Sequence, residues 1–384
     1  LALGKRLPSG GSHMSAARRH REVSPDQARS PMLELPGRRA APGILLVLLI
    51  TGTGVPVRAQ EPSLFHDQRP AMGTTFEVYL YASGEGEAQA LFETVFEEVE
   101  RIEGELSTYR ATSELSRINA AAAHGPVTTD PEVFGLLADA MAWSRRSQGA
   151  YDITVGPLVK AWGFFRGEGR YPDPEELARA RGSVGWRGVR LDETERTVRF
   201  LSPGIELDLG GGGKGYALDR AAVLLRELGV ESALLSAGQS SYYALGAPPG
   251  AGGWRIQVPH PVEEGRTIST VEIRDGSLST SGSTEKHFVL EGTRYHHIFD
   301  PRTGHPVQGT VQVTVTAPGA ADSDALSTAL FVLGARDGAA LVREVPGASA
   351  LLVSGPPWEM EVSSVNWPAE VDWPRAAQPG FRRR

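Results

Sequence analysis

The segment Glu206–Asp219 combines residue types that can bind an anion. It reads Glu-Leu-Asp-Leu-Gly-Gly-Gly-Gly-Lys-Gly-Tyr-Ala-Leu-Asp, so four glycines separate a strand-like run from a helical one. Such a turn lets a phosphate approach backbone N–H groups at a helix start, and Lys214 adds a positive charge. A nucleotide P-loop is excluded, because Gly215 follows the lysine where Ser or Thr is required. A dinucleotide fingerprint matches only weakly, because four consecutive glycines satisfy many patterns. The next predicted strand, ending at Ser236, also lacks the acidic residue that binds a ribose. A bare tight turn remains the alternative.

Asp324 and Thr328 could supply oxygen ligands to a metal ion. They lie four residues apart in a helical pattern, which places both on one face of the helix. A carboxylate and a hydroxyl suit Mg²⁺, which keeps waters or phosphate oxygens at its other positions. The pair also has an ordinary structural explanation, because Asp favours a first helical turn and Thr can bond to its own backbone.

Two adjacent histidines, His296 and His297, precede an Asp-Pro turn in the segment Tyr295–Gly304. In an extended chain their side chains point to opposite faces, so they cannot easily bind one metal together. One of them could act as a general base while the other plays a different part. The segment Gly149–Leu158 joins Tyr151 and Asp152 to turn residues, which alone indicates little.

Periodicity predicts the elements that must position these residues. Strands are expected at Thr74–Tyr81, Ser232–Ser236, Trp254–Val258, Ile268–Ile273, Ser277–Ser281, Lys286–Leu290, Val311–Thr316 and Ala348–Val353, and helices at Glu85–Leu106, Pro131–Arg146, Leu218–Leu228, Asp322–Leu333 and Ala335–Arg343. Helices and strands are interspersed without a regular βαβ rhythm or a repeat. We therefore predict an α+β fold formed by a single intertwined domain.

The N-terminal 59 residues are set apart from this domain. Arg38 and Arg39 precede the apolar run Ile44–Ile50, and small residues lead to Ala59, which is the layout of a secretory signal cleaved after that alanine. Seven apolar residues are too few to span a bilayer as a stable helix. We predict a translation start at Met32, with upstream sequence before it. The folded domain is expected over 60–354, and a Pro/Trp/Arg-rich C-terminal tail, an edge segment plus a loose end, over 355–384.

Composition excludes several functional classes. The chain has 384 residues, 40% of them hydrophobic, which is enough for a sizeable core. It has no cysteine, so disulfide scaffolds, thiolate metal sites, cysteine nucleophiles and lipidation at cysteine are excluded. Beyond residue 59 the net charge is −13, counting Lys and Arg against Asp and Glu. An acidic body is a poor nucleic-acid binder, so no nucleic-acid partner is expected.

Seven segments, taken in order, together resemble the FAD:protein FMN transferase (ApbE-like) family. They cover roughly residues 72–354 and are Met72-Gly-Thr, Leu106-Ser-Thr-Tyr with Ser113–Asn119, Tyr151–Pro157, Asp208-Leu-Gly-Gly with Lys214-Gly-Tyr-Ala, Ser279–Gly282, His297–Gly304 and Asp324–Leu330. The resemblance implies that FAD is cleaved at its pyrophosphate with Mg²⁺ as cofactor. FMN would then be attached to a Thr or Ser of an exported redox-protein subunit, and AMP released.

Matching the family's motifs assigns a role to each site residue. Asp324 and Thr328 resemble the metal-binding side chains, with the carbonyl of Gly211 as third ligand. His297 resembles the catalytic base that activates the acceptor hydroxyl. The expected FAD contacts are Met72, Tyr109, Ala150, Tyr151, Asp152, Asp208 and Lys214, with Tyr109 as a ring neighbour.

The sequence also departs from the family and leaves alternatives open. Where the family shows a Gly-Gly pair followed by an acidic or amide residue, this chain reads Ser236-Ala-Gly-Gln-Ser-Ser241. An FAD pyrophosphatase giving free FMN and AMP could use the same site, and a non-catalytic periplasmic flavin-binding protein is a further alternative. An NAD-type dehydrogenase is disfavoured by the missing acidic residue. The expected location is the bacterial periplasm or another exported compartment. Membrane association would be at most transient through the signal segment, which could hold the protein at the inner membrane if uncleaved.

Overall fold

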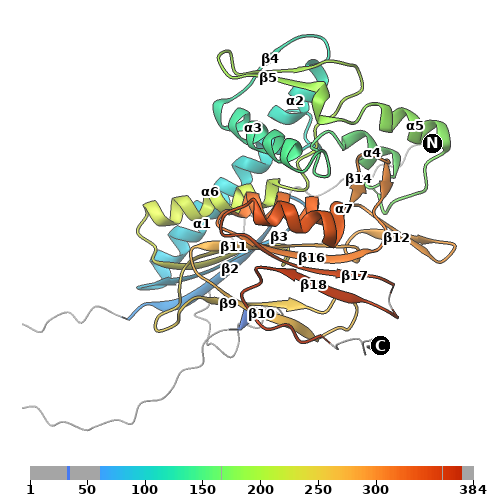
Figure 1. Cartoon of the computed structure of the whole chain (residues 1–384). Coiled ribbons are helices and arrows are strands. Elements are labelled where there is room, and N and C mark those ends of the chain that lie inside the picture. Colours follow the sequence, from blue (N-terminus) through green and yellow to red (C-terminus); the bar gives the residue numbers. More distant parts are fainter. Residues whose placement is uncertain (1–32, 35–60, 166, 357, 374–384) are drawn as a thin grey trace, which may run out of the picture.

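An eight-stranded antiparallel sheet forms the centre of the molecule (Figure 1). This computed structural model describes residues 33–34, 61–165, 167–356 and 358–373. The strand order is β18-β17-β16-β11-β8-β7-β3-β2. The bounds are β2 Ser63–Ala71, β3 Thr74–Ala82, β7 Ser232–Ala237, β8 Ser241–Gly246, β11 Gly276–Gly282, β16 Thr310–Ala317, β17 Ser349–Ser354 and β18 Glu361–Val365. Strands far apart in sequence, such as β3 and β7, are neighbours, so the sheet joins distant parts of residues 63–365.

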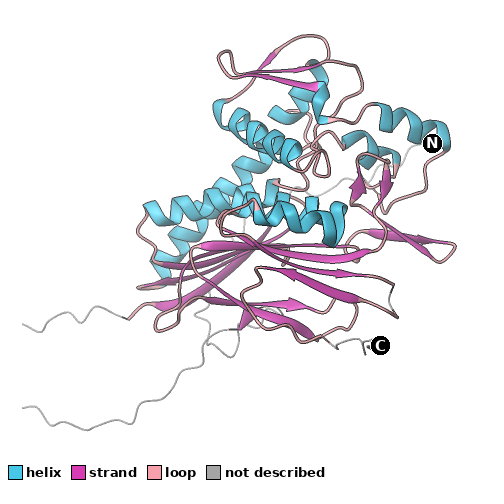
Figure 2. Ribbon diagram, in the orientation of Figure 1, coloured by secondary structure: helices cyan, strands magenta, loops and turns pink. Residues whose placement is uncertain are grey.

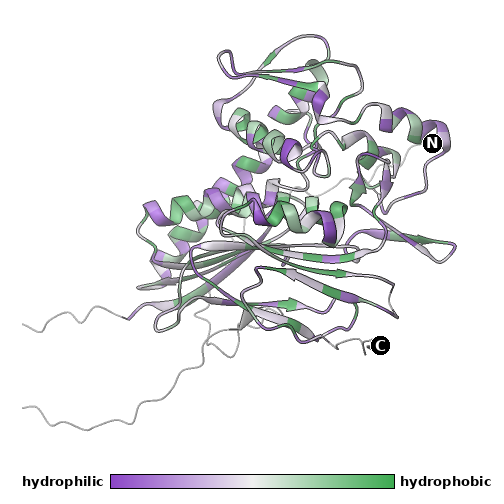
Figure 3. Ribbon diagram, in the orientation of Figure 1, coloured by the Kyte–Doolittle hydropathy of each residue, from purple (hydrophilic) through white to green (hydrophobic). Residues whose placement is uncertain are grey.

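The two faces of the sheet are covered differently (Figure 2). Helices α1 (Glu85–Leu106), α6 (Gly213–Glu227) and α7 (Ala320–Arg343) pack on one face. A smaller sheet packs on the other face through β9 (Trp254–Pro259) and β10 (Thr267–Ile273), and β1 (Leu33–Glu34) pairs with β9. The helices carry both apolar and polar residues, as expected when one side of a helix is buried (Figure 3).

The remaining elements lie beyond the helical layer and at its edge (Figure 1). They are α2 (Glu114–Ala121), β4 (Val127–Thr128), α3 (Pro131–Arg146), α4 (Gly156–Ala161), α5 (Pro174–Gly182), the short 3₁₀ helix Trp186–Gly188, β5 (Val189–Asp192), β6 (Thr197–Phe200), β12 (His287–Leu290), β13 (Thr293–His296), β14 (Phe299–Asp300) and β15 (His305–Pro306). Strands β12 and β13 form a hairpin that projects from the edge of the molecule.

Two glycines shape the helical layer. A Cβ on Gly215 of α6 would lie 2.1 Å from the carbonyl oxygen of Ala320, so only glycine allows α6 to approach the start of α7 this closely. Gly334 interrupts α7 with φ +72°, which separates two helical segments. By length and hydropathy α7 could also cross a membrane, but 56% of its apolar window is buried, as is typical of a core helix.

The predicted α+β class is confirmed, and most predicted elements are present. Helices α1 and α3 have the predicted bounds, and the two helices expected on either side of Gly334 are the two segments of α7. Helix α6 begins at Gly213, five residues before the predicted start. Strands β2 and β8 of the central sheet and helix α2 are among the elements that were not predicted, as are α4, α5, β5 and β6.

Part of the segment 355–384, which we predicted to be a C-terminal tail, packs against the domain. Residues 361–365 form the edge strand β18, as the predicted edge segment requires. Trp367 Nε1 donates to Ser269 Oγ at 3.0 Å, and the Trp373 ring stacks on His260 at 4.8 Å between centroids. The chain is therefore packed as far as Trp373, rather than loose from the end of the strand. Residues 374–384 and the predicted signal segment 37–59 lie outside the described residues.

Candidate functional site

The glycine turn closes largely on the chain's own oxygen atoms. The N–H of Gly210 donates to Asp208 Oδ1 at 2.7 Å. The N–H groups of Gly212 and Gly213 both donate to the Leu209 carbonyl, at 3.0 and 2.7 Å. Three of the expected donors are therefore already used, and the turn is not the open cradle of N–H groups that its sequence suggests. Anion binding here would depend on the lysine side chain that follows.

The turn packs directly against α7 and Tyr151. A Cβ on Gly211 would lie 3.2 Å from Thr328 Oγ1 and 3.3 Å from Tyr151 Cε2, and one on Gly212 would lie 2.8 Å from the Tyr151 hydroxyl. Any side chain at these two positions would push the turn away from its neighbours. The absence of side chains thus brings Gly211 beside Thr328, as the predicted metal site requires.

Asp324 is buried in the first half of α7, and its carboxylate is fixed from two sides. Oδ2 accepts the Gly215 N–H at 2.9 Å, and Oδ1 accepts the Ser241 hydroxyl at 2.7 Å. Each carboxylate oxygen has a second lone pair, so these bonds leave room for a metal ion. Ligating carboxylates are normally held by hydrogen bonds in this way. Thr328 lies one helical turn further on the same face.

These donors fit a magnesium ion chemically. The carboxylate of Asp324, the hydroxyl of Thr328 and the carbonyl of Gly211 are all hard oxygen ligands. Within the described residues, no group of three or more His, Cys, Asp or Glu could hold a metal ion. A site with so few protein ligands suits Mg²⁺, which is commonly bound by one or two carboxylates together with substrate phosphates and water.

His297 lies just beyond β13 and faces the start of the hairpin. Its backbone N–H donates to the Lys286 carbonyl at 3.1 Å, and its ring Nδ1 lies 3.3 Å from the same oxygen. With the proton on Nδ1, Nε2 is left able to accept a proton. Burial lowers the pKa of His297 to about 4, outweighing the carbonyl bond, and the charges of Lys286 and Lys214 also lower it. The ring is therefore neutral at pH 7, as a general base must be.

His296 faces the opposite way, as expected for adjacent residues in an extended chain. Its Nε2 lies 2.7 Å from the Val307 carbonyl, its Nδ1 accepts the Ile298 N–H at 3.2 Å, and its ring packs on Phe331 in a T-shaped arrangement. The side chain is only 2% exposed. Both ring nitrogens serve the fold, so His296 is a structural residue.

The other predicted FAD contacts surround the same turn. Lys214 Nζ donates to Ser240 Oγ at 2.7 Å. Met72, with φ +51°, donates its N–H to Glu103 at 3.0 Å, and its Cε would be 3.4 Å from a Cβ on Gly213.

Ala150, Tyr151 and Asp152 are buried together beside the turn. Asp152 accepts hydrogen bonds from Thr154 and from the Trp186 N–H at 2.8 Å, so its visible contacts shape the local loop. Burial raises the pKa of Tyr151, with the charge of Asp324 acting in the same direction. Whether these residues touch FAD stays a prediction.

Asp208 borders a polar cavity of about 250 Å³. Burial raises the pKa of Asp208, against the Gly210 hydrogen bond. The cavity is lined by Thr108, Ser116, Asn119, Ala120, Gly156, Lys160, Phe165, Glu206, Leu207 and Asp208. Tyr109, which is half-exposed, stacks on the lining residue Phe165 at 4.6 Å between ring centroids. The residue predicted as a ring neighbour thus forms an aromatic pair with one wall of the cavity.

Four side chains that hold the site residues in place were not predicted from the sequence. Asn119 pairs with both backbone groups of Leu207, at 2.7 and 2.9 Å, and so fixes the residue before Asp208. Ser240 and Ser241 bind Lys214 and Asp324 from the turn between β7 and β8. Asp219 of α6 caps the start of α7 by accepting two of its N–H groups. All four residues lay in segments already noted, but no local pattern marks their contacts, because each contact joins residues far apart in the sequence.

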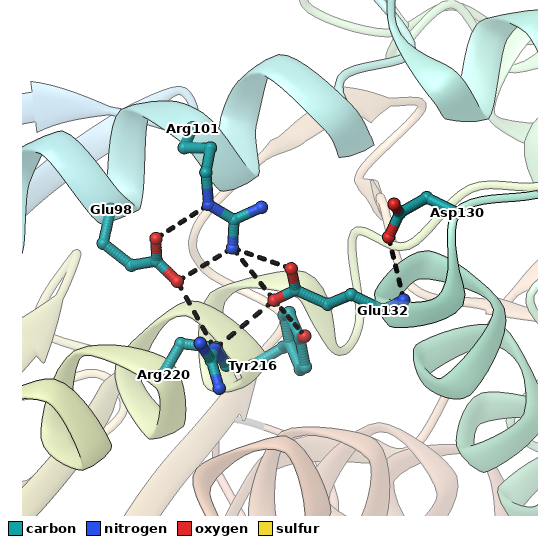
Figure 4. Close-up of polar contacts among 6 residues, drawn as sticks. All are labelled: Glu98, Arg101, Asp130, Glu132, Tyr216 and Arg220. Carbon is teal, nitrogen blue, oxygen red and sulfur yellow. Dashed lines mark hydrogen bonds and ion pairs between the residues drawn. The ribbon is translucent and has the colours of Figure 1, made fainter.

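A charged network holds α6 against its neighbours (Figure 4). Arg101 of α1 contacts Glu98 at 2.7 Å and Glu132 of α3 at 2.9 Å, and Arg220 of α6 contacts the same two carboxylates at 3.3 Å. The hydroxyl of Tyr216, in the first turn of α6, donates to Glu132 at 2.6 Å. Three helices are thereby joined next to the glycine turn.

Comparisons with known proteins show the family to which this chain belongs. A sequence model described as the ApbE family matches residues 72–352. An FAD:protein FMN transferase of Treponema pallidum (strain Nichols) is 35% identical over 298 residues, covering 73% of this chain and 82% of that protein. One of Klebsiella pneumoniae (strain 342) is 36% identical over 286 residues, covering 74% and 87%. The solved ApbE protein of Thermotoga maritima superposes with a TM-score of 0.72 at 32% identity, covering 79% of this chain and 97% of that one. The apo flavinyl transferase ApbE of Pseudomonas stutzeri gives 0.71 at 31% identity, covering 80% and 96%.

Proposed function

The chain belongs to the ApbE family of FAD:protein FMN transferases, and from that premise we propose the finer features of its reaction. The enzyme transfers FMN from FAD to a Thr or Ser hydroxyl of an exported redox-protein subunit and releases AMP. Transfer depends on Mg²⁺ held by Asp324, Thr328 and the carbonyl of Gly211. His297 is the general base.

The observation that carries this proposal is the meeting of three kinds of group around one turn. Gly211 lies against Thr328, Asp324 binds the N–H of Gly215, and Lys214 is close enough to His297 to lower its pKa. Phosphoryl transfer requires charge neutralisation on the phosphate and an aligned nucleophile. A hard-oxygen metal site, an ammonium group and a neutral imidazole supply those requirements together.

In the proposed reaction the acceptor oxygen attacks the phosphorus on the FMN side of the pyrophosphate. A new phosphoester bond forms, the bond from that phosphorus to the bridging oxygen breaks, and AMP leaves with the electron pair. His297 takes the hydroxyl proton on Nε2, because Nδ1 faces the Lys286 carbonyl. Lys214 carries positive charge toward the pyrophosphate, and bound Mg²⁺ would neutralise further charge there. No nucleophile on the enzyme is needed.

The proposed acceptor and cellular location both follow from the predicted secretory signal. The signal layout of residues 37–59 supports export to the periplasm, with at most transient membrane association through that segment. An exported enzyme meets exported acceptors, so a redox subunit outside the cytoplasm is the expected partner.

The principal alternative is FAD pyrophosphatase activity at the same site, with water in place of the protein hydroxyl. A storage protein is less consistent with the oxygen ligands beside the glycine turn, because storing FAD requires no metal at the pyrophosphate. The deciding experiment incubates the protein with FAD, Mg²⁺ and a purified candidate acceptor, followed by mass spectrometry. FMN bound to acceptor Thr or Ser supports the proposal. Free FMN and AMP alone, with every acceptor unmodified, would replace it with the pyrophosphatase.

A further inference from the structure

The tight turn between β7 and β8 places two adjacent serine hydroxyls on the two charged groups of the site. Ser241 donates to Asp324 Oδ1, and Ser240 accepts from Lys214 Nζ, both at 2.7 Å. Ser241 is fully buried and Ser240 is 7% exposed. This is the segment in which the sequence departs from its family, and the proposed mechanism assigns it no part.

The turn is held rigidly by three strands of the central sheet. Gly238 donates its N–H to the Thr75 carbonyl of β3 at 2.8 Å, and Thr280 of β11 donates its N–H to the Ser240 carbonyl at 2.6 Å. Ser241 itself pairs with Ala237 of β7 and with β11. Both serines are therefore fixed by backbone pairing, independently of the helices that they contact.

Each hydroxyl completes a different interaction. The Asp324 carboxylate is bound at one oxygen by the Gly215 N–H and at the other by Ser241, which prevents rotation about its last bond. Lys214 has a flexible side chain, and one of its three N–H donors is held by Ser240. A serine is an uncharged acceptor, so it orients the ammonium group without cancelling the charge.

We propose that the two serines are positioning residues with separate tasks. Ser241 orients Asp324 for a divalent cation, and Ser240 directs Lys214 toward the pyrophosphate of FAD. The inference rests on the proposed function, since it assumes that Asp324 and Lys214 have those ligands. It predicts that two neighbouring residues of one turn control two different binding equilibria.

The test measures each equilibrium without turnover. Mn²⁺ affinity is followed by electron paramagnetic resonance, and FAD affinity by flavin fluorescence in EDTA, for the full chain and for S240A and S241A. We expect S241A to weaken Mn²⁺ binding by about 10-fold or more, as is usual for loss of a group that holds a metal ligand. Its FAD affinity in EDTA should stay within about twofold, because the Ser241 hydroxyl contacts Asp324 and the hydroxyl that contacts Lys214 belongs to Ser240. S240A should show the reverse, with FAD affinity reduced and Mn²⁺ affinity unchanged.

Matched variants separate positioning from simple stability. S240T restores a hydroxyl and should recover FAD affinity. If S241A folds poorly, S241C replaces the hydroxyl with a slightly larger thiol that is a weaker donor, and it should also weaken Mn²⁺ binding. Ser232→Ala removes another buried hydroxyl from β7, for which no hydrogen-bond partner is present in the described structure, and should change neither affinity. Equal effects of S240A and S241A on both ligands, or melting-temperature losses alone, would overturn the inference while leaving the proposed function intact. Failure of the wild-type protein to bind both Mn²⁺ and FAD would overturn the two together.

Discussion

The joint between α6 and α7 and the end of the β13 strand hold buried titratable groups of opposite character. At the α6–α7 joint, Asp219 accepts the N–H groups of Ala320 and Ala321 at 2.7 and 2.8 Å, and burial raises its pKa to about 6. At the strand end, burial lowers the pKa of His296 and of His297 to about 4. Acidification therefore favours the folded form of one region and opposes that of the other.

The difference reflects what each region must do. At the joint, α6 and α7 pack closely at Gly215, and backbone N–H groups bind the carboxylates of Asp219 and Asp324. The joint can therefore hold Asp324 and Thr328 in a fixed arrangement. The strand end is the base of the β12–β13 hairpin, which projects from the edge of the molecule (Figure 1). Under the proposed function, the joint would hold the metal ion, and the strand end would supply the base that activates the acceptor hydroxyl.

Replacing Asp324 by Ala should have the largest effect on activity. It removes the only carboxylate among the proposed metal ligands, so Mg²⁺-dependent FAD turnover should fall to the background level. Asp337→Ala, an exposed carboxylate change on the same helix, is the matched control and should keep full turnover. Circular dichroism establishes that both variants are folded. Near-normal turnover by Asp324→Ala at limiting Mg²⁺ would show that the joint does not hold the metal.

His297→Ala should lower the rate of flavin transfer by about 10²–10⁴-fold, the usual range for loss of a general base. FAD affinity should change little, because the proposed contact of this ring is with the acceptor hydroxyl. Single-turnover transfer and flavin fluorescence measure the two quantities. In the wild type, the rate should fall with acidification as His297 becomes protonated near pH 4. Transfer at the wild-type rate by the variant would remove His297 from the mechanism and leave the family assignment unchanged.

The sequence predicted regular elements and local motifs better than contacts between them. Helix α1 has 22 residues with apolar positions at helical spacing, and its predicted bounds are correct. Strands β7 and β8 are both fully buried, so neither shows the alternation that marks a strand with one exposed face. Strand β7 was found from the helix end and Gly229 that precede it, and β8 was missed because no such signal precedes it. The early start of α6 was missed because glycines are poor helix formers, and close packing against α7 overrides that preference here.

The candidate site shows the same limit. The spacing of Asp324 and Thr328 predicted one helical face, and adjacency predicted opposite directions for the two histidines. The contact between Ser241 and Asp324 joins residues 83 positions apart, so only the sheet topology brings them together. We expected an open set of N–H groups that could bind phosphate, because the sequence shows the positions of the four glycines. The sequence does not show that three of these N–H groups donate to oxygen atoms of the turn itself.

His296→Ala should reduce stability and leave the chemical step nearly unchanged. The variant loses a buried ring and leaves the Val307 carbonyl without its partner, which together should cost about 2–4 kcal/mol in the free energy of unfolding. Because the folded-state pKa is lowered, the wild-type stability from this group is present above its ordinary pKa of 6.5 and is lost as the pH falls toward 4. Denaturant unfolding at pH 7 and pH 4.5 should thus show a smaller difference between wild type and variant at the lower pH. A selective loss of transfer rate without loss of stability would reverse the roles of the two histidines.

Asp219→Asn should produce a smaller effect with the opposite pH dependence. The raised folded-state pKa means that the contribution of Asp219 to stability is fully present below its ordinary value of 3.8 and is lost as the pH rises through about 6. Asparagine keeps one acceptor oxygen for the start of α7 but does not titrate, so the stability advantage of the wild type should shrink by about 1–3 kcal/mol between pH 4 and pH 7. Denaturant unfolding in EDTA and without FAD keeps any cation away from neighbouring Asp324. Measuring His296→Ala in the same series should give a slope of opposite sign. Parallel slopes for the two variants would mean that the joint and the strand end respond alike to protons, and the contrast between them would fail.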